Sequence, residues 1–139
     1  ERAADNGLTE SGIMHARLTR KVPYVLAGSI RDDGPLPGVH SHSLEAQDAM
    51  REHAVKATGA ILVASALHAI AVGNMLPAYH MNYDGIPTPL MTICVDQTEF
   101  VVNKLKDRGT HQAYGVVTNA QACMHGLRFY TDKWAQASS

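Results

Sequence analysis

The stretch Val25-Leu-Ala-Gly-Ser-Ile-Arg-Asp-Asp-Gly-Pro-Leu-Pro37 decides how the chain is organised. It begins within a short apolar run over residues 24–27, which is typical of a buried strand. Gly28 ends that run, and a charged segment that includes Arg31 and Asp33 leads into a turn rich in Gly and Pro. A buried strand followed by such a loop is how an open α/β sheet forms a binding crevice at its carboxyl edge. The alternative is a solvated surface turn, where Asp, Gly and Pro are also common.

The composition indicates a single globular domain. The chain has 139 residues, of which 45% are hydrophobic and 18% are charged, and this is enough for one domain with its own core. The formal net charge of −1 does not favour nucleic acid or an anionic membrane surface as a partner. The longest apolar run, over residues 57–67, is much shorter than the ~20 residues of a membrane span. The chain opens on Glu1 rather than Met, as a fragment or a processed product would.

The positions of the cysteines and histidines indicate neither a disulfide bond nor a metal site. Cys94 lies in an apolar run and Cys123 in a helical pattern, which favours reduced core residues over a disulfide framework. We therefore expect a reducing compartment, such as the cytoplasm or an organelle matrix. His40 and His42 are spaced like a pair of metal ligands, but no further ligand follows at suitable spacing. A solvated loop and no metal site are therefore predicted there.

Apolar runs and helical patterns alternate along the chain. Strands are predicted over residues 24–27, 60–64, 91–95 and 113–117. Helices are predicted over residues 9–20, from Ser41 or Ser43 to about 57, over 65–72 and 99–108, and from Thr118 or Asn119 to about 135. The last helix has Met124, Leu127, Phe129, Tyr130 and Trp134 available for burial. Strands that alternate with helices predict an α/β fold, with a mostly parallel sheet covered by helices on both faces.

Residues 77–90 are predicted to form a long loop, because Pro77, Pro87 and Pro89 interrupt regular structure. Tyr79 and Tyr83 give this loop an apolar surface that is unusual in solvated segments. One interpretation is an insertion that packs on its own domain. The other is a contact with a partner chain or with the rest of a longer protein, in which case both tyrosines are exposed in this chain alone.

Polar residues follow each predicted strand at the point where a parallel sheet binds its ligands. Asp96 can accept hydrogen bonds from ribose hydroxyls, and His68 can contact a phosphate or relay a proton. The helix starts at Ser65 and Asn119 offer backbone N–H groups to an anion. The alternatives are that Asp96 is only a helix cap and that His68 is a satisfied interior histidine. The usual dinucleotide fingerprint, Gly-x-Gly-x-x-Gly, is absent from the sequence.

The sequence resembles the C-terminal half of the NAD-dependent archaeal-type ornithine cyclodeaminase family, whose conserved region is named after lysine-oxoglutarate reductase/saccharopine dehydrogenase. The same region is the C-terminal module of the cyanobacterial bifunctional arginine dihydrolase/ornithine cyclodeaminases. The resemblance runs from about Ala3 to Gly126 and rests on the segments LTESGIMHARLTRKVPYVLAGSIRDDGPLPGV, SLEAQDAMREH, LHAIAVGNMLP, TICVD and LKDRGTHQAYGVVT. It implies a Rossmann-like NAD-binding domain similar to that of deoxyhypusine synthase, which explains a nucleotide site without the glycine fingerprint.

The resemblance implies a set of cofactor contacts at the strand ends described above. The implied NAD contacts are Asp33, Ser65, Ala66, Leu67, His68, Asp96, Asn119 and Ala120. Asp96 is also the candidate catalytic residue, because its carboxylate can hold either the cofactor's ribose or the substrate's amine. The chain departs from the family at four places. It has Ser65-Ala66 where the family commonly has Thr-Met before Leu-His, and Asn119 where the family usually has the Asp of Val-Thr-Asp. It also has His42 in place of an Asp, and its loop at 78–90 is longer than that of the family.

The function implied by the resemblance is that of an NAD-dependent lyase of amino-acid metabolism, which converts ornithine to proline and ammonia through hydride transfer to and from NAD. Residues 1–139 are then one NAD-binding-type α/β domain, a fragment or the C-terminal half of a larger protein. Its expected partners are ornithine, the missing N-terminal half, and other chains of an oligomer. The alternative is a non-catalytic structural subunit, a remnant of this family within a larger assembly.

Overall fold

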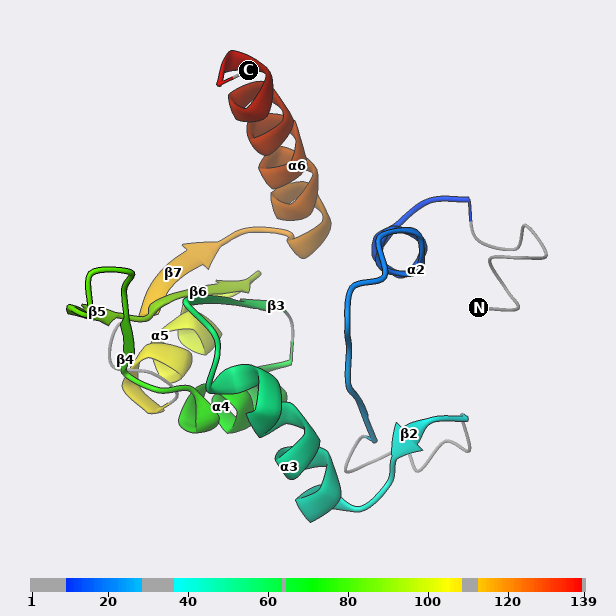
Figure 1. Ribbon diagram of the computed structural model, residues 1–139, viewed down its shortest axis with the longest axis vertical. Coiled ribbons are helices and arrows are strands. Elements are labelled where there is room, and N and C mark those ends of the chain that lie inside the picture. Colours follow the sequence, from blue (N-terminus) through cyan, green and yellow to red (C-terminus); the bar gives the residue numbers. More distant parts are fainter. Residues whose placement is uncertain (1–9, 29–36, 64, 109–112, 139) are drawn as a thin grey trace. The chain divides into compact units, whose positions relative to one another are not determined.

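The computed structural model describes residues 10–28, 37–63, 65–108 and 113–138 of the chain. The chain divides into two compact units, residues 1–50 and residues 51–139, and the residues of α3 (Ser43–Ala54) belong partly to each. The other elements of the first unit are α2 (Ile13–Thr19), β1 (Leu26–Ala27) and β2 (Val39–His40). Those of the second are β3 (Gly59–Val63), α4 (Ala66–Met75), β4 (Tyr79–Met81), β5 (Pro87–Pro89), β6 (Met91–Asp96), α5 (Glu99–Arg108), β7 (Ala113–Val117) and α6 (Ala120–Ala137) (Figure 1).

The first unit holds a small parallel sheet made of β1 and β2. Leu26 is in register with Val39, and the backbone amide of Gly28 extends the ladder by donating to the carbonyl of His40 at 2.9 Å. The strand predicted over residues 24–27 is therefore regular only in its second half. The sequence does not predict its partner β2, because two residues are too few to form a period-2 pattern.

The helices of the first unit are shorter than predicted. α2 begins at Ile13, after Gly12, whose φ of 95° is a conformation that glycine adopts readily. Of the predicted helix over residues 9–20, Thr9 lies outside the described residues. α3 begins at Ser43, and the carbonyl of His42 accepts from the amide of Ala46. Neither serine is therefore the capping residue, because the cap position falls on His42.

The second unit is built on a three-stranded parallel sheet with the order β3-β6-β7. Leu62 of β3 is in register with Cys94 of β6, which is in register with Gly115 of β7. The strands predicted over 60–64, 91–95 and 113–117 are confirmed to within a residue at each described end. The predicted parallel α/β arrangement is therefore confirmed for these strands, whose carboxyl ends share one edge of the sheet.

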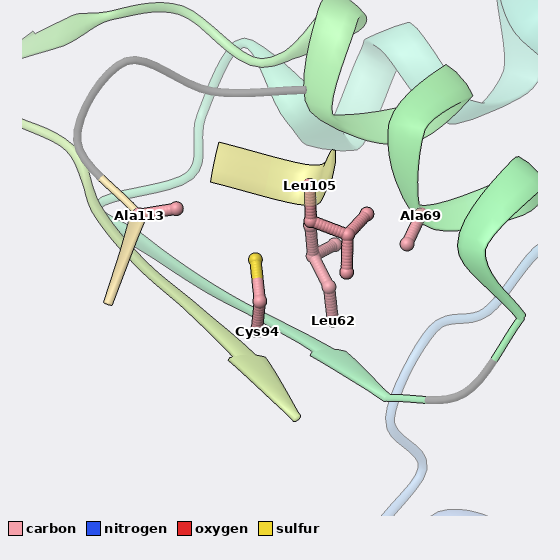
Figure 2. Packing of buried hydrophobic residues seen from close by; sticks show 5 residues of the cluster. All are labelled: Leu62, Ala69, Cys94, Leu105 and Ala113. Carbon is pink, nitrogen blue, oxygen red and sulfur yellow. The ribbon is translucent and has the colours of Figure 1, made fainter. Parts of the chain in front are cut away.

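The core of the second unit lies between this sheet and the helices α4 and α5. Leu62, Cys94 and Ala113 reach it from the three strands, Ala69 from α4 and Leu105 from α5 (Figure 2). Apolar side chains three or four residues apart on α5 form the stripe that packs on the sheet. Figure 1 shows α4 and α5 together along the sheet, so each helix that links two parallel strands covers the sheet it connects.

The long segment predicted as a loop contains a β-hairpin instead. β4 and β5 pair antiparallel, with His80 in register with Thr88. The Asn82 side chain fixes the turn, because its Oδ1 accepts from the amides of Asp84 and Ile86 at 2.9 and 2.8 Å. The prediction of an irregular loop is wrong because Pro87 and Pro89 are themselves paired in the hairpin, in register with Met81 and Tyr79. They alternate with the hydrogen-bonded pairs of the antiparallel ladder, so the ladder does not need their missing N–H groups.

The last helix follows the prediction in position but not in burial. α6 begins at Ala120 and contacts β6, yet none of its residues is buried in this chain. Of the side chains that the sequence makes available for burial, Leu127, Phe129, Tyr130 and Trp134 are exposed and Met124 is half-buried. Within the described residues, no helix has both the length and the apolar character needed to cross a membrane.

Candidate functional site

The parallel register brings the residues that follow β3, β6 and β7 to one edge of the sheet. Val63 is in register with Val95, and Asp96 is in register with Val117, so the three strands end side by side. Ser65 and His68 follow β3, Asp96 ends β6, and Asn119 follows β7. We call this group the carboxyl-edge cluster: Ser65, His68, Asp96, Thr98 and Asn119. Asp33, the remaining charged residue of the predicted site, lies outside the described residues.

Ser65 and His68 form a hydrogen-bonded pair at the start of α4. The Ser65 Oγ lies 2.7 Å from the Nδ1 of His68, and both side chains are exposed. Ser65 occupies the N-cap position of α4 but makes no side-chain bond to the first-turn amides. Its backbone has a φ of 50° and a ψ of 95°, which a residue with a side chain rarely adopts. The exposure of His68 argues against the alternative of a satisfied interior histidine.

Asp96 is held at the end of β6 by hydrogen bonds on two sides. Its Oδ1 accepts from the amide of Thr98 at 3.0 Å and from the Thr98 hydroxyl at 3.3 Å. Its backbone carbonyl accepts from the amide of Thr118 at 2.8 Å, which fixes the turn before α6 beside it. No described residue hydrogen-bonds the second carboxylate oxygen, Oδ2. The carboxylate therefore combines a local structural role with one oxygen that can accept from a ligand.

Thr98 belongs to the cluster although sequence reasoning did not select it. Its Oγ1 accepts from the amide of Val101 at 3.4 Å, so it caps α5 while its own amide and hydroxyl hold Asp96. The available signal was a Thr directly before a helix that starts at Glu99, two residues after a strand-end Asp. Thr98 is thus the residue that orients the Asp96 carboxylate.

Asn119, one of the two residues predicted to cap the last helix, caps α6. Its Oδ1 accepts from the amides of Gln121 at 2.9 Å and Ala122 at 3.2 Å. The side-chain oxygen of Asn119 is therefore used within the chain, and its amide nitrogen is the group that remains for a ligand. Ala120, the first residue of α6, can offer only its backbone.

The three helices of this edge differ in how their N-termini are satisfied. Thr98 caps α5 and Asn119 caps α6, whereas the serine at the cap of α4 bonds to His68 instead. Ala66 and Leu67 form the first turn of α4, and the Leu67 side chain is exposed. An uncapped helix N-terminus favours an anion, because it presents backbone N–H groups and the positive end of the helix dipole.

The cysteines and histidines offer no competing centre within the described residues. Cys94 and Cys123 are both free, as predicted, and burial raises the pKa of the Cys94 thiol. Among residues 10–28, 37–63, 65–108 and 113–138, no three His, Cys, Asp or Glu side chains are grouped so as to hold a metal ion.

The sequence of this chain matches a known family and several named proteins. The family model described as "Arginine dihydrolase ArgZ-like, C-terminal, Rossmann fold" matches residues 1–127. The ornithine cyclodeaminase of Methanopyrus kandleri is 47% identical over 117 residues, which is 84% of this chain and 26% of that protein. The bifunctional arginine dihydrolase/ornithine cyclodeaminase AgrE of Nostoc sp. is 37% identical over 132 residues, 95% of this chain and 17% of that protein.

Two solved structures resemble this chain in both sequence and fold. A crystal structure of a conserved putative LOR/SDH protein from Methanococcus maripaludis S2 is 42% identical, with a TM-score of 0.69 over 85% of this chain and 33% of that one. The ternary complex of AgrE with ornithine and NAD+ is 40% identical, with a TM-score of 0.67 over 85% of this chain and 16% of that one. This chain therefore spans about a quarter of the length of the first curated relatives it matches.

Proposed function

Because the chain belongs to the family of the C-terminal, Rossmann-fold domain of ArgZ-like arginine dihydrolases, we propose that it is the NAD-binding module of an ornithine cyclodeaminase-like enzyme. The observation that carries the proposal is the carboxyl-edge cluster, which gathers polar groups where parallel α/β sheets bind nucleotides. The AgrE complex with ornithine and NAD+ supports both the cofactor and the substrate, since its fold and sequence match over most of this chain.

The residues of the cluster fit the parts of NAD. The Oδ2 of Asp96 can accept a hydrogen bond from a ribose hydroxyl, while Thr98 holds Oδ1. The uncapped N-terminus of α4, with Ser65, Ala66, Leu67 and His68, suits the diphosphate. Asn119 and Ala120 flank Asp96 through the turn that Thr118 anchors, and they complete the proposed contacts. Asp33 is proposed as a further contact on the strength of the family resemblance.

Bound NAD supplies the acceptor and donor of hydride that the conversion of ornithine to proline and ammonia needs. The chain's own residues hold and orient the cofactor. Asp96 fixes the ribose through a charge-assisted hydrogen bond, and Thr98 keeps its carboxylate from rotating. A direct catalytic role of Asp96, in which its carboxylate holds the amine of the substrate, stays a prediction.

The whole protein is proposed to be longer and to act as an oligomer in a reducing compartment. Residues 1–139 are proposed as one NAD-binding-type domain, since the family match runs through both compact units. Tyr79 and Tyr83 of the hairpin are 57% and 109% exposed, as expected if another part of the protein or a partner chain covers them. Cys94 and Cys123 are free, which agrees with reduced thiols.

A non-catalytic structural subunit of the same family is the second candidate. Two observations favour it: the side-chain oxygen of Asn119 is used to cap α6, and one oxygen of Asp96 is used to hold Thr98. Both interactions stabilise the fold without any ligand.

The test is a calorimetric titration of the full-length protein with NAD, followed by an assay of proline and ammonia formation from ornithine. Saturable binding with turnover is the result we expect. Binding without turnover supports the cofactor site but rejects the enzyme. Absence of binding rejects both and favours the structural subunit. A known ornithine cyclodeaminase, assayed in parallel, is the positive control.

A further inference from the structure

Ser65 stands out in this fold because it combines an unfavourable backbone with an unusual side-chain contact. Its φ of 50° lies where L-residues are disfavoured, whereas glycine adopts such values readily. Lys21 is the only other non-glycine residue with positive φ among those described, and it lies just after the end of α2. A serine is therefore a costly choice at position 65 unless its hydroxyl is needed.

The hydroxyl of Ser65 is not used in the way that its position predicts. A serine at an N-cap normally accepts a hydrogen bond from the backbone amide three residues later. Here the Ser65 Oγ instead lies 2.7 Å from the Nδ1 of His68, the side chain of that same residue. The pair thus leaves the helix start uncapped and constrains an exposed imidazole at the edge of the sheet.

We propose that Ser65 is a positioning residue, which holds the His68 imidazole in one orientation and one tautomer for contact with the diphosphate of the dinucleotide. When the Ser65 hydroxyl donates to Nδ1, the proton of the neutral ring lies on Nε2. Nε2 is then a donor for a phosphate oxygen, and no described residue hydrogen-bonds it. The inference rests on the proposed function, because it assigns a role within that NAD site.

The chemistry of the site explains why such positioning is useful. An exposed imidazole rotates freely and exchanges between two tautomers, so only part of the population presents a donor in the right direction. A short hydrogen bond within one helical turn selects the productive form before the ligand arrives. The uncapped amides of α4 offer further N–H donors in the same place, so both features of Ser65 favour the same anionic group.

The test is a double-mutant cycle on the full-length protein, with NAD affinity measured by calorimetry. Ser65→Gly relaxes the backbone while removing the hydroxyl, and Ser65→Ala removes the hydroxyl alone. We expect each to weaken NAD binding by about 3- to 10-fold, the range of one lost neutral hydrogen bond. In a His68→Ala background, the same changes should alter the affinity by less than about 2-fold, because the partner through which Ser65 acts is gone.

A spectroscopic readout separates positioning from a merely structural role. Nitrogen-15 chemical shifts of His68 should report the Nε2–H tautomer in the wild type and a mixture of tautomers in Ser65→Gly. Lys21→Gly is the matched control, since it relaxes a similar φ of 53° and should leave both the tautomer and the NAD affinity unchanged.

The outcomes distinguish this inference from the function it rests on. A wild-type protein that does not bind NAD overturns the proposed function and the inference with it. A wild type that binds NAD, with Ser65 variants of equal affinity, overturns only the inference. So does a Ser65 effect that persists at full size in the His68→Ala background, because Ser65 would then act without the imidazole.

Discussion

Replacement of Asp96 separates its two roles in the proposed NAD site. In the folded chain, Oδ1 accepts from the amide and hydroxyl of Thr98, and Oδ2 is the oxygen available to a ligand. Asp96→Asn keeps an oxygen for Thr98 and removes the charge. Asp96→Ala removes both, so its effect on stability is expected to be larger. The carboxylate supports the start of α5, so Asp96→Ala is expected to affect the fold as well as the binding of NAD.

The magnitudes follow from these contacts. Loss of the whole charge-assisted hydrogen bond in Asp96→Ala should weaken NAD binding by about 1.5–3 kcal/mol, or roughly 10- to 150-fold. Asp96→Asn keeps a neutral polar group and should lose about 1–2 kcal/mol, roughly 5- to 30-fold. Because Thr98 loses its acceptor, Asp96→Ala should also lower the free energy of unfolding by about 1 kcal/mol. Asp96→Asn should change the unfolding free energy by less than about 0.5 kcal/mol.

The assay is calorimetric titration of the full-length protein with NAD, beside urea unfolding of each variant. Asp107→Asn, which removes the same charge from the last turns of α5, is the control and should not change either quantity. Unchanged NAD affinity in both Asp96 variants would refute the ribose role. If only Asp96→Ala weakens NAD binding, and does so in proportion to its loss of unfolding free energy, then Asp96 supports the start of α5 but does not bind the ribose.

Three further predictions concern the core, the thiols and the hairpin. Gly115→Ala should lower the free energy of unfolding by about 1–3 kcal/mol in urea, since the new Cβ would overlap the Cγ1 of Val102; equal stability would show that α5 yields without strain. Burial raises the pKa of the Cys94 thiol, so a thiol reagent should label Cys123 before Cys94. The free energy of unfolding should also fall as the pH rises above about 8.5, because the unfolded state loses the Cys94 proton before the folded state does. Preferential labelling of Cys94, or a free energy of unfolding that rises over this pH range, would contradict the burial of Cys94. Tyr83→Ser should reduce self-association of the full-length protein in sedimentation velocity without altering its unfolding, because the side chain is fully exposed; unchanged association would reject the hairpin as an interface.

The sequence is sufficient to predict the regular part of the second unit. The strands that carry Leu62, Cys94 and Ala113 are apolar runs of ordinary strand length, and α5 has a clear helical stripe. Parallel order follows from the alternation of strands and helices, so the shared edge that carries Asp96 could be expected before any coordinates.

The features that sequence reasoning did not predict depend on single contacts rather than on patterns. The hairpin around Asn82 was not predicted because its second strand contains two prolines, which are paired at positions where the ladder needs no N–H donor. The support that Thr98 gives to Asp96, and the bond from Ser65 to His68, both depend on side-chain rotamers that no periodicity encodes. Trp134 is exposed because none of the described residues covers it, which the apolar pattern of α6 cannot reveal.

A crystal structure of the full-length protein with NAD would show whether the carboxyl edge of the sheet is the cofactor site. We expect the dinucleotide to lie across the carboxyl ends of β3, β6 and β7, with a ribose hydroxyl bonded to Oδ2 of Asp96 and a diphosphate oxygen at the start of α4, within reach of Nε2 of His68. A dinucleotide bound at the opposite edge of the sheet, or one that contacts neither Asp96 nor the start of α4, would rule out this cofactor site.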